Sequence, residues 1–162
     1  MSSQPVDRLH PVVDFAHRLR ERLDSVAKVP LWSMTEEQQR DALTTLAHAE
    51  AQLDALKLGL LAEVDRSGAT TETGAGTAAD WIAIETRQVR RDARSDLRLA
   101  QAVERHDLLS AAMSEGRVNT APARATVAAL DRLPSTGEFA VSTEQRLAAE
   151  THLVSSTTPA SR

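Results

Sequence analysis

The sequence predicts an all-α protein, a helical bundle organised around one long helix from about Thr35 to Ser67. The hydrophobic fraction is 41% but the aromatic fraction only 2%, because alanine and leucine supply most of it. These two residues lead the helix-propensity scale. The long segment contains no proline and a single glycine, and its apolar residues alternate four and three apart. Such spacing places a narrow apolar stripe along one side of a helix.

The long helix carries recognisable signals at both ends. Thr35 and Gln38 have the spacing of a capping box, in which each side chain binds the backbone N–H of the other residue. Gly68 is a suitable C-terminal stop. Residues 43, 47, 61 and 64 widen the apolar stripe, so we expect it to face a bundle core. The stripe itself consists of Ala42, Leu46, Ala49, Leu53, Leu56 and Leu60.

A first, shorter helix is predicted to precede the long one. Residues 1–10 resemble a flexible leader, and the helical pattern starts at Pro11 and ends before Pro30. Trp32, in the connector, is expected to fill the space between the two helices, since a lone indole is usually a packing anchor. The apolar face of this first helix is formed by Val12, Phe15, Ala16, Leu19, Leu23 and Val26.

A pair of helices follows the long one after a glycine-rich loop. Thr77 and Asp80 indicate the start of a short helix containing Trp81, and a turn near residues 87–90 leads into a second helix. This order, over residues 78–105, is that of a helix-turn-helix-like pair. The loop lacks the Lys-Ser/Thr of a phosphate-binding loop, so we interpret it as a plain connection.

The remaining sequence predicts three further helices. One ends at Gly116, the next is expected to be capped by Thr120, and Ser142 with Gln145 forms a capping box for the last. Together these elements predict a single helical domain over residues 11–154. The polar residues 155–162 are predicted to be a disordered tail.

Composition limits the classes of function. Cysteine is absent, which excludes disulfides and thiolate metal sites and fits a cytoplasmic protein. No apolar run approaches 18 residues, so we expect no membrane span. The net charge of −4 argues against a general nucleic-acid binder, but the distribution of charge matters more than its sum.

Positive charge is concentrated in residues 87–105. This segment has six arginines, three acids and no lysine, and a helical wheel gathers the arginines on one side with Arg105. Arginine makes bidentate contacts to phosphate and guanine, so one interpretation is a surface for duplex DNA. The other is a solvated face whose arginines pair with acids of neighbouring helices. The candidate nucleic-acid-binding residues are Arg87, Arg90, Arg91, Arg94 and Arg98.

Neither a catalytic residue nor a metal site nor a cofactor is predicted. The five histidines form no H-E-x-x-H motif, and we expect them at the surface or at its boundary. Asp14 and His17 have the spacing of a bundle metal motif, but no matching set is visible elsewhere. The sequence also lacks G-x-S-x-G and a cysteine nucleophile.

Three segments of the chain are characteristic when taken together: AEAQLDALKLGLLAEVDRSGA, GTAADWIAIETRQVRRDARSDLRLAQAV and MSEGRVNTAPARATVAALDRLP. With these segments, residues 36–153 resemble the actinobacterial 13E12 repeat family. In that family a helical domain of unknown function lies N-terminal to an HNH endonuclease domain. The HNH module has no counterpart here, so no catalytic residue is carried over. The resemblance implies a fragment of a longer nuclease or a truncated gene product.

Two functional hypotheses remain. The resemblance implies a non-catalytic, DNA-associated helical module of an HNH-endonuclease-type protein, with duplex DNA bound through the arginine-rich helix. The apolar stripe of the long helix supports a different class, a homodimerisation or protein-interaction module. The two are compatible, because many duplex binders are dimers.

Overall fold

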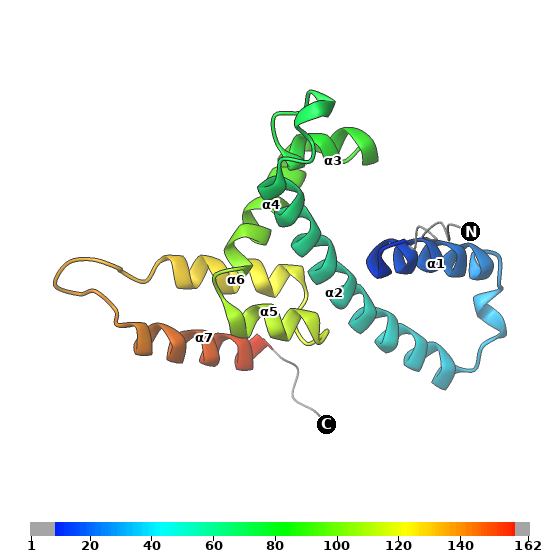
Figure 1. Cartoon of the computed structure of the whole chain (residues 1–162). Helices are drawn as coiled ribbons and strands as arrows, with labels where there is room; N and C mark the ends of the chain where they lie inside the picture. The colour runs from blue at the N-terminus through cyan, green and yellow to red at the C-terminus, as the bar shows by residue number, and fades with distance from the viewer. Residues whose placement is uncertain (1–8, 158–162) are drawn as a thin grey trace, which may run out of the picture. The chain divides into compact units, whose positions relative to one another are not determined.

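The computed structural model describes residues 9–157, which contain seven α-helices and no strand (Figure 1). The all-α prediction is therefore confirmed. Two short 3₁₀ turns lie at Leu31–Ser33 and Thr71–Thr73. The helices are α1 (Pro11–Val26), α2 (Glu36–Ser67), α3 (Ala78–Thr86), α4 (Arg90–Val103), α5 (Asp107–Ser114), α6 (Thr120–Asp131) and α7 (Thr143–Thr157).

The chain divides into two compact units between Asp41 and Ala42. The interval 11–154, predicted as a single helical domain, thus spans both units. Of the predicted leader, residues 1–8 lie outside the described residues, and His10 accepts a hydrogen bond from the N–H of Val12 at 3.2 Å. The predicted tail begins too early, since α7 continues to Thr157; residues 158–162 lie outside the described part.

The first unit has no buried residue among those described. The predicted apolar face of α1 remains largely exposed, with Phe15 and Leu23 about half accessible. Trp32 is 84% exposed, so the expectation that it fills a gap between helices is wrong. The capping box is confirmed: the N–H of Thr35 donates to Gln38 Oε1 at 2.9 Å, and that of Gln38 to Thr35 Oγ1 at 3.2 Å.

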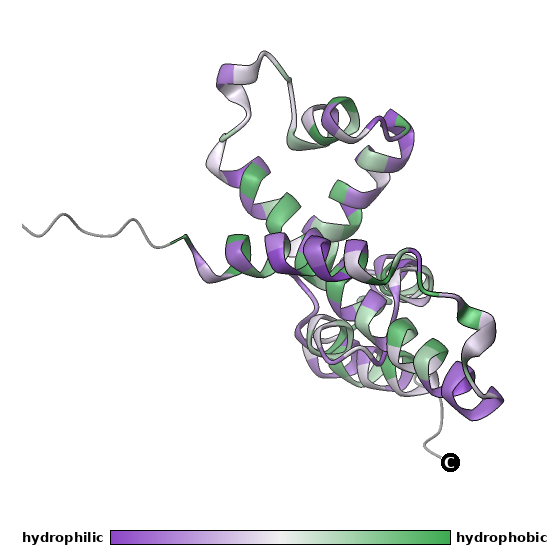
Figure 2. Ribbon diagram, turned by 90° about the vertical axis from the view of Figure 1, so that its right-hand side faces the viewer, coloured by the Kyte–Doolittle hydropathy of each residue, from purple (hydrophilic) through white to green (hydrophobic). Residues whose placement is uncertain are grey.

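The side of α2 that is buried within the second unit is not the one predicted. Ala51, Leu58 and Ala62 are buried in the core, with Ala55 packed beside them. The predicted stripe lies on the opposite side of the helix and stays exposed or half-buried. Both sets follow the same four-and-three spacing, which is why the pattern alone selected the wrong one. Figure 2 shows how hydrophobic and hydrophilic residues alternate along the helices.

The main core of the second unit joins α2 to α4, α5, α6 and α7. Leu109, Met113 and Leu130 are fully buried. Polar groups of α7 close the ends of its neighbours: the Arg146 guanidinium donates to the carbonyls of Leu130 and Leu133 at 3.0 and 3.2 Å. The Leu130 carbonyl also accepts the N–H of Leu133 at 3.1 Å, so the arginine adds a second hydrogen bond there and ties α7 to the C-terminal end of α6.

The turn after α5 touches the backbone of α2. Gly116 has φ of +76°, and a Cβ built there would lie 2.8 Å from the carbonyl oxygen of His48. Only glycine allows this approach together with the left-handed conformation. The predicted capping box of α7 is confirmed: the N–H of Ser142 donates to Gln145 Oε1 at 2.9 Å, and that of Gln145 to Ser142 Oγ at 3.1 Å.

The predicted helix pair over residues 78–105 is present as α3 and α4. Thr77 caps α3 by accepting the N–H of Asp80 at 3.1 Å. Small residues allow the two helices to pack closely, and Leu61 of α2 and Ile82 cover their contact. The buried residues between them are Ala79, Ala83, Ala93 and Leu97. None of the helices within residues 9–157 is long and apolar enough to span a bilayer.

Candidate nucleic-acid interface

The turn between α3 and α4 is built on an arginine in an unusual conformation. Arg87 ends α3 with φ of +56° and ψ of 28°, and its N–H donates to the carbonyl of Ile84 at 3.4 Å. It is the one non-glycine residue with positive φ among residues 9–157. Elsewhere in the described chain glycine occupies such positions, for example Gly68 and Gly74. A left-handed non-glycine residue costs about 1–2 kcal/mol, so the arginine is retained at some expense to stability.

The helical register of α4 exposes its arginines. Ala93, Leu97 and Ala100 are buried against the rest of the unit. The opposite side then carries the charged residues, because a helix repeats every 3.6 residues. The arginines on this exposed side are Arg90, Arg91, Arg94 and Arg98.

One of these arginines is committed to the fold. Nε and Nη2 of Arg94 both donate to Asp80 Oδ1, at 3.2 and 2.8 Å, and so tie α4 to α3. The other carboxylate oxygen accepts the hydroxyl of Thr77 at 2.9 Å. The hydrogen bond from Thr77, then that from Arg94, lowers the pKa of Asp80 below its ordinary value of 3.8, with a smaller contribution from the charge of Arg90. For Arg94, the pairing interpretation is therefore the one observed.

The other four candidates remain available. Within residues 9–157, the side chains of Arg87, Arg90, Arg91 and Arg98 make no hydrogen bond or ion pair. We call these four side chains the arginine surface. They come from one turn and from the first three turns of one helix, so a single ligand lying along α4 could contact several of them.

The N-terminus of α4 adds unsatisfied donors to this surface. Val89 occupies the N-cap position and provides no side-chain hydrogen bond. The first N–H groups of a helix lack intrahelical partners, and the helix dipole makes this end positive. Two further cations, Arg90 and Arg91, occupy the first turn, against one acid, Asp92. This arrangement is unfavourable for an isolated helix and favourable for a bound anion.

One acid of α4, two residues before Arg98, has other partners. Asp96 accepts a hydrogen bond from Gln88 Nε2 at 3.0 Å and forms an ion pair with Arg124 of α6. Nη1 of Arg124 also donates to the Ser95 carbonyl at 3.0 Å. Because Asp96 is paired with Arg124 of α6, it does not pair with the arginines of α4. Sequence reasoning missed Arg124, since nothing local indicates a pair 28 residues apart.

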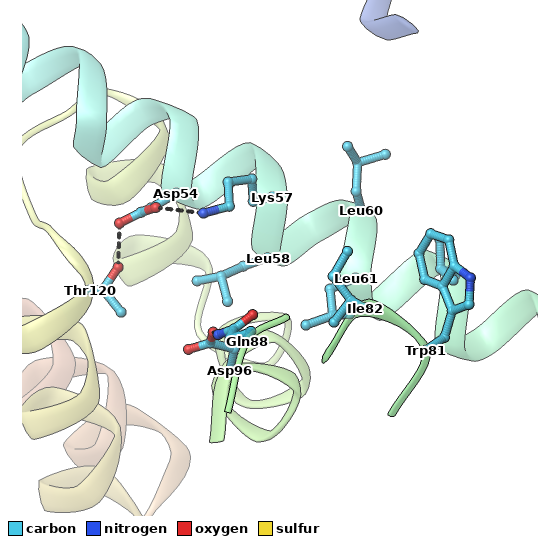
Figure 3. A pocket seen from close by; sticks show the side chains of 11 residues that line it. Asp54, Lys57, Leu58, Leu60, Leu61, Trp81, Ile82, Gln88, Asp96 and Thr120 are labelled. Carbon is cyan, nitrogen blue, oxygen red and sulfur yellow. Dashed lines mark hydrogen bonds and ion pairs between the residues drawn. The ribbon is translucent and has the colours of Figure 1, made fainter. Parts of the chain in front are cut away.

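An apolar groove of about 500 Å³ lies between α2 and the turn of the helix pair (Figure 3). Leu58, Leu61 and Ile82 line it. Its polar groups are paired with one another. Asp54 accepts the hydroxyl of Thr120 at 2.8 Å and forms an ion pair with Lys57 at 3.4 Å. Thr120 was predicted as a helix cap; instead Asn119 holds the N-cap position of α6, and Thr120 ties α6 to α2.

A buried acid and histidine also escaped sequence reasoning. Glu150 of α7 accepts the N–H of Leu109 at 3.0 Å and so caps α5. Nδ1 of His106 lies 3.8 Å from the same carboxylate, and both residues are buried, so the prediction of surface or boundary histidines is wrong for His106. Among the described residues, no group of three His, Asp or Glu side chains is placed to hold a metal ion.

The fold and this surface define an all-α protein whose exposed, basic helix belongs to a packed helix pair. No protein-family model matches the sequence, and comparisons with characterised proteins and with solved structures returned no match.

Proposed function

We propose that the chain is a non-catalytic helical module that binds duplex DNA through the arginine surface. The observation that carries this proposal is the set of four arginines without partners around the positive end of α4. Phosphate is the ligand that best matches them, because guanidinium groups and free helix N–H groups both bind phosphate oxygens. A duplex presents such groups in a regular row along each strand.

The conformation of Arg87 supports the same proposal. Strained backbone tends to persist where function requires it, and here glycine would relieve the strain but remove the charge. The absence of aromatic side chains from residues 87–105 argues against a single-strand stacking platform. Duplex DNA is therefore the preferred class of ligand.

The resemblance to the 13E12 repeat family supports a DNA-associated role as well. By analogy with that family, the module would position or regulate an HNH nuclease and perform no chemistry itself. No metal or cofactor enters this proposal.

The test is fluorescence anisotropy of a labelled random duplex titrated with the protein at several salt concentrations. We expect log K to fall with log salt at a slope of about −0.9 per phosphate contact. The variant Arg90→Gln/Arg91→Gln/Arg98→Gln should weaken binding by at least tenfold and reduce the slope by up to about 3. Arg94 is left intact, because its bonds to Asp80 hold the helix pair together.

The matched control is Arg20→Gln/Arg22→Gln/Arg132→Gln. These three arginines are also exposed, and both variants remove three positive charges from a chain of net charge −4. Binding that both variants weaken equally would reflect net charge alone and would overturn the proposed surface. Circular dichroism establishes that both variants remain folded.

A second function, homodimerisation, is favoured by one observation, the exposed apolar stripe of α2. It belongs to a different class of protein, an assembly module, and it does not exclude DNA binding. The geometry that it implies is argued next.

A further inference from the structure

The exposed side of α2 carries a continuous apolar stripe, which we call the α2 stripe. Leu46 is 61% exposed and Leu60 45%, while Leu53 and Leu56 are half-buried. Scattered exposed leucines are normal in proteins, but a continuous row along one helix marks an interaction surface. The stripe consists of Ala42, Leu46, Ala49, Leu53, Leu56 and Leu60, all within the second unit.

The α2 stripe points away from the core of its own unit. At 100° per residue its members cluster within about 80° of arc, opposite to Ala51, Leu58 and Ala62. Figure 3 shows Leu58 and Leu60 leaving different sides of α2, with Leu58 directed toward Asp96 and Gln88. A partner helix on the stripe would therefore leave the core of the unit undisturbed.

The spacing of the stripe matches the surface that another helix requires. Alternating steps of four and three are the a and d positions of a coiled coil, whose knobs enter holes on a facing helix. A flat protein surface or a membrane imposes no such spacing. The occupant indicated by the pattern is thus an α-helix running nearly parallel or antiparallel to α2.

The stripe is complementary to itself when it is reversed. Around residue 51, position 42 lies opposite 60, position 46 opposite 56, and position 49 opposite 53. Two of these three layers place an alanine against a leucine, so large side chains face small ones and the layers interdigitate. Every a position meets a d position, as in antiparallel pairs. A second copy of the same helix therefore fits without a shift in register.

The charges beside the stripe do not prevent this arrangement. Glu50 and Lys57 lie on one flank, and antiparallel pairing about residue 51 places Glu50 of each copy near Glu50 of the other at the exposed edge of the interface, where like charges repel only weakly. Lys57 can keep its exposed pair with Asp54, at 3.4 Å. The other flank, at Thr45, Gln52 and Gly59, is uncharged, so nothing there opposes association.

We propose that two copies of this chain associate through the α2 stripe as an antiparallel, two-fold symmetric helix pair centred near Ala51. The interface is isologous, as in most homodimers. The dimer does not depend on the proposed DNA binding, because it uses the apolar α2 stripe and not the arginine surface, and it requires no ligand.

The oligomeric state is measured by sedimentation equilibrium of the full chain without DNA. We expect a mass twice the 17.6 kDa of the monomer at micromolar concentration. Leu46→Asp should raise the dissociation constant of the dimer at least tenfold, because the exposed side chain of Leu46 contributes to the interface and not to the core. Ala47→Asp, exposed on another side of α2, is the control and should leave the mass unchanged.

Cysteine cross-linking tests the direction of pairing, because the chain contains no native cysteine. Leu46→Cys mixed with Leu56→Cys should form a disulfide-linked dimer on oxidation. Each variant alone should not, since antiparallel pairing separates identical positions by about 15 Å along the axis. A monomeric full chain would overturn the dimer, and self-linking of Leu46→Cys alone would overturn the antiparallel arrangement.

Discussion

Arg94 and Asp80 join the two helices of the pair by a bidentate contact, with Nε and Nη2 donating to one carboxylate oxygen at 3.2 and 2.8 Å. The contact separates Arg94 from the other arginines of α4. Its guanidinium orients α4 on α3, while Arg90, Arg91 and Arg98 project from the scaffold without partners. The arginines of α4 therefore fall into two groups: Arg94 holds α4 on α3, and the others remain exposed. The difference arises from a single acid of α3, Asp80.

We predict that Asp80 titrates below pH 3.8, because hydrogen bonds from Thr77 and Arg94 stabilise its charged form. Its pKa is lowered on folding, so the stability it contributes is present above the unfolded pKa and is lost as pH falls through the folded value. A pH titration of the carboxyl carbon followed by NMR measures this pKa directly.

The causes can be separated by substitution. Thr77→Val and Arg94→Gln should each raise the pKa of Asp80, since the hydrogen bond from Thr77, and the hydrogen bond and charge of Arg94, all lower it. Asp80→Asn should make the free energy of unfolding depend less on pH in the acid range. Denaturation between about pH 2 and 5, the range in which carboxyl groups titrate, measures this dependence. An Asp80 pKa at or above 3.8 in the wild-type protein would contradict the assigned contacts.

Arg87→Gly should increase the free energy of unfolding by about 1 kcal/mol, because glycine adopts positive φ without the cost borne by arginine. The same substitution should reduce the salt slope of DNA binding by about 1. Thermal denaturation and anisotropy measure the two effects on one sample. Arg87→Asn is the control, since asparagine tolerates the left-handed region and also lacks the charge. Loss of stability in Arg87→Gly would show that the side chain supports the fold.

Local features of this fold could be predicted from the sequence. The capping boxes at Thr35 and Ser142 are formed by residues three apart, so the sequence contains both partners of each hydrogen bond. The same holds for Thr77 at the start of α3. Proline, glycine and apolar spacing located every helix, because these signals also act within a few residues.

Long-range features could not be predicted. The two apolar sides of α2 share one period, and burial of Leu58 instead of Leu60 depends on residues of α4 to α7 that follow much later in the sequence. The partners of Asp80 and Asp96, on α4 and α6, were hidden for the same reason. The arginines were correctly placed on the exposed side of α4, but the sequence could not tell that Arg94 is paired and its neighbours are not.

Gly116→Ala should destabilise the second unit by about 2–3 kcal/mol. The new Cβ would meet the His48 carbonyl oxygen at 2.8 Å, and alanine would also be forced to adopt φ of +76°. Gly74→Ala is a matched control, because Gly74 has the same φ and a Cβ built there meets no atom within 4 Å. Its cost of about 1 kcal/mol would isolate the backbone term. Equal losses in the two variants, measured by urea denaturation, would contradict a close contact between α2 and the turn.

Leu58→Ala and Leu60→Ala should affect the protein in different ways, although the residues are two apart on α2. Leu58 is 7% exposed in the core, so its truncation should cost about 2–4 kcal/mol at any protein concentration. Leu60 is 45% exposed, so its loss should cost less than about 1 kcal/mol in the monomer.

The difference between these leucines becomes visible when protein concentration is varied. The denaturation midpoint of a dimer rises with concentration by mass action. Leu58→Ala should lower the midpoint while keeping this dependence, and Leu60→Ala should reduce the dependence while changing the dilute midpoint little. If Leu60→Ala instead behaved like Leu58→Ala, with a large and concentration-independent loss, the stripe would belong to the core of the monomer. The helix would then bury both of its apolar sides within one chain.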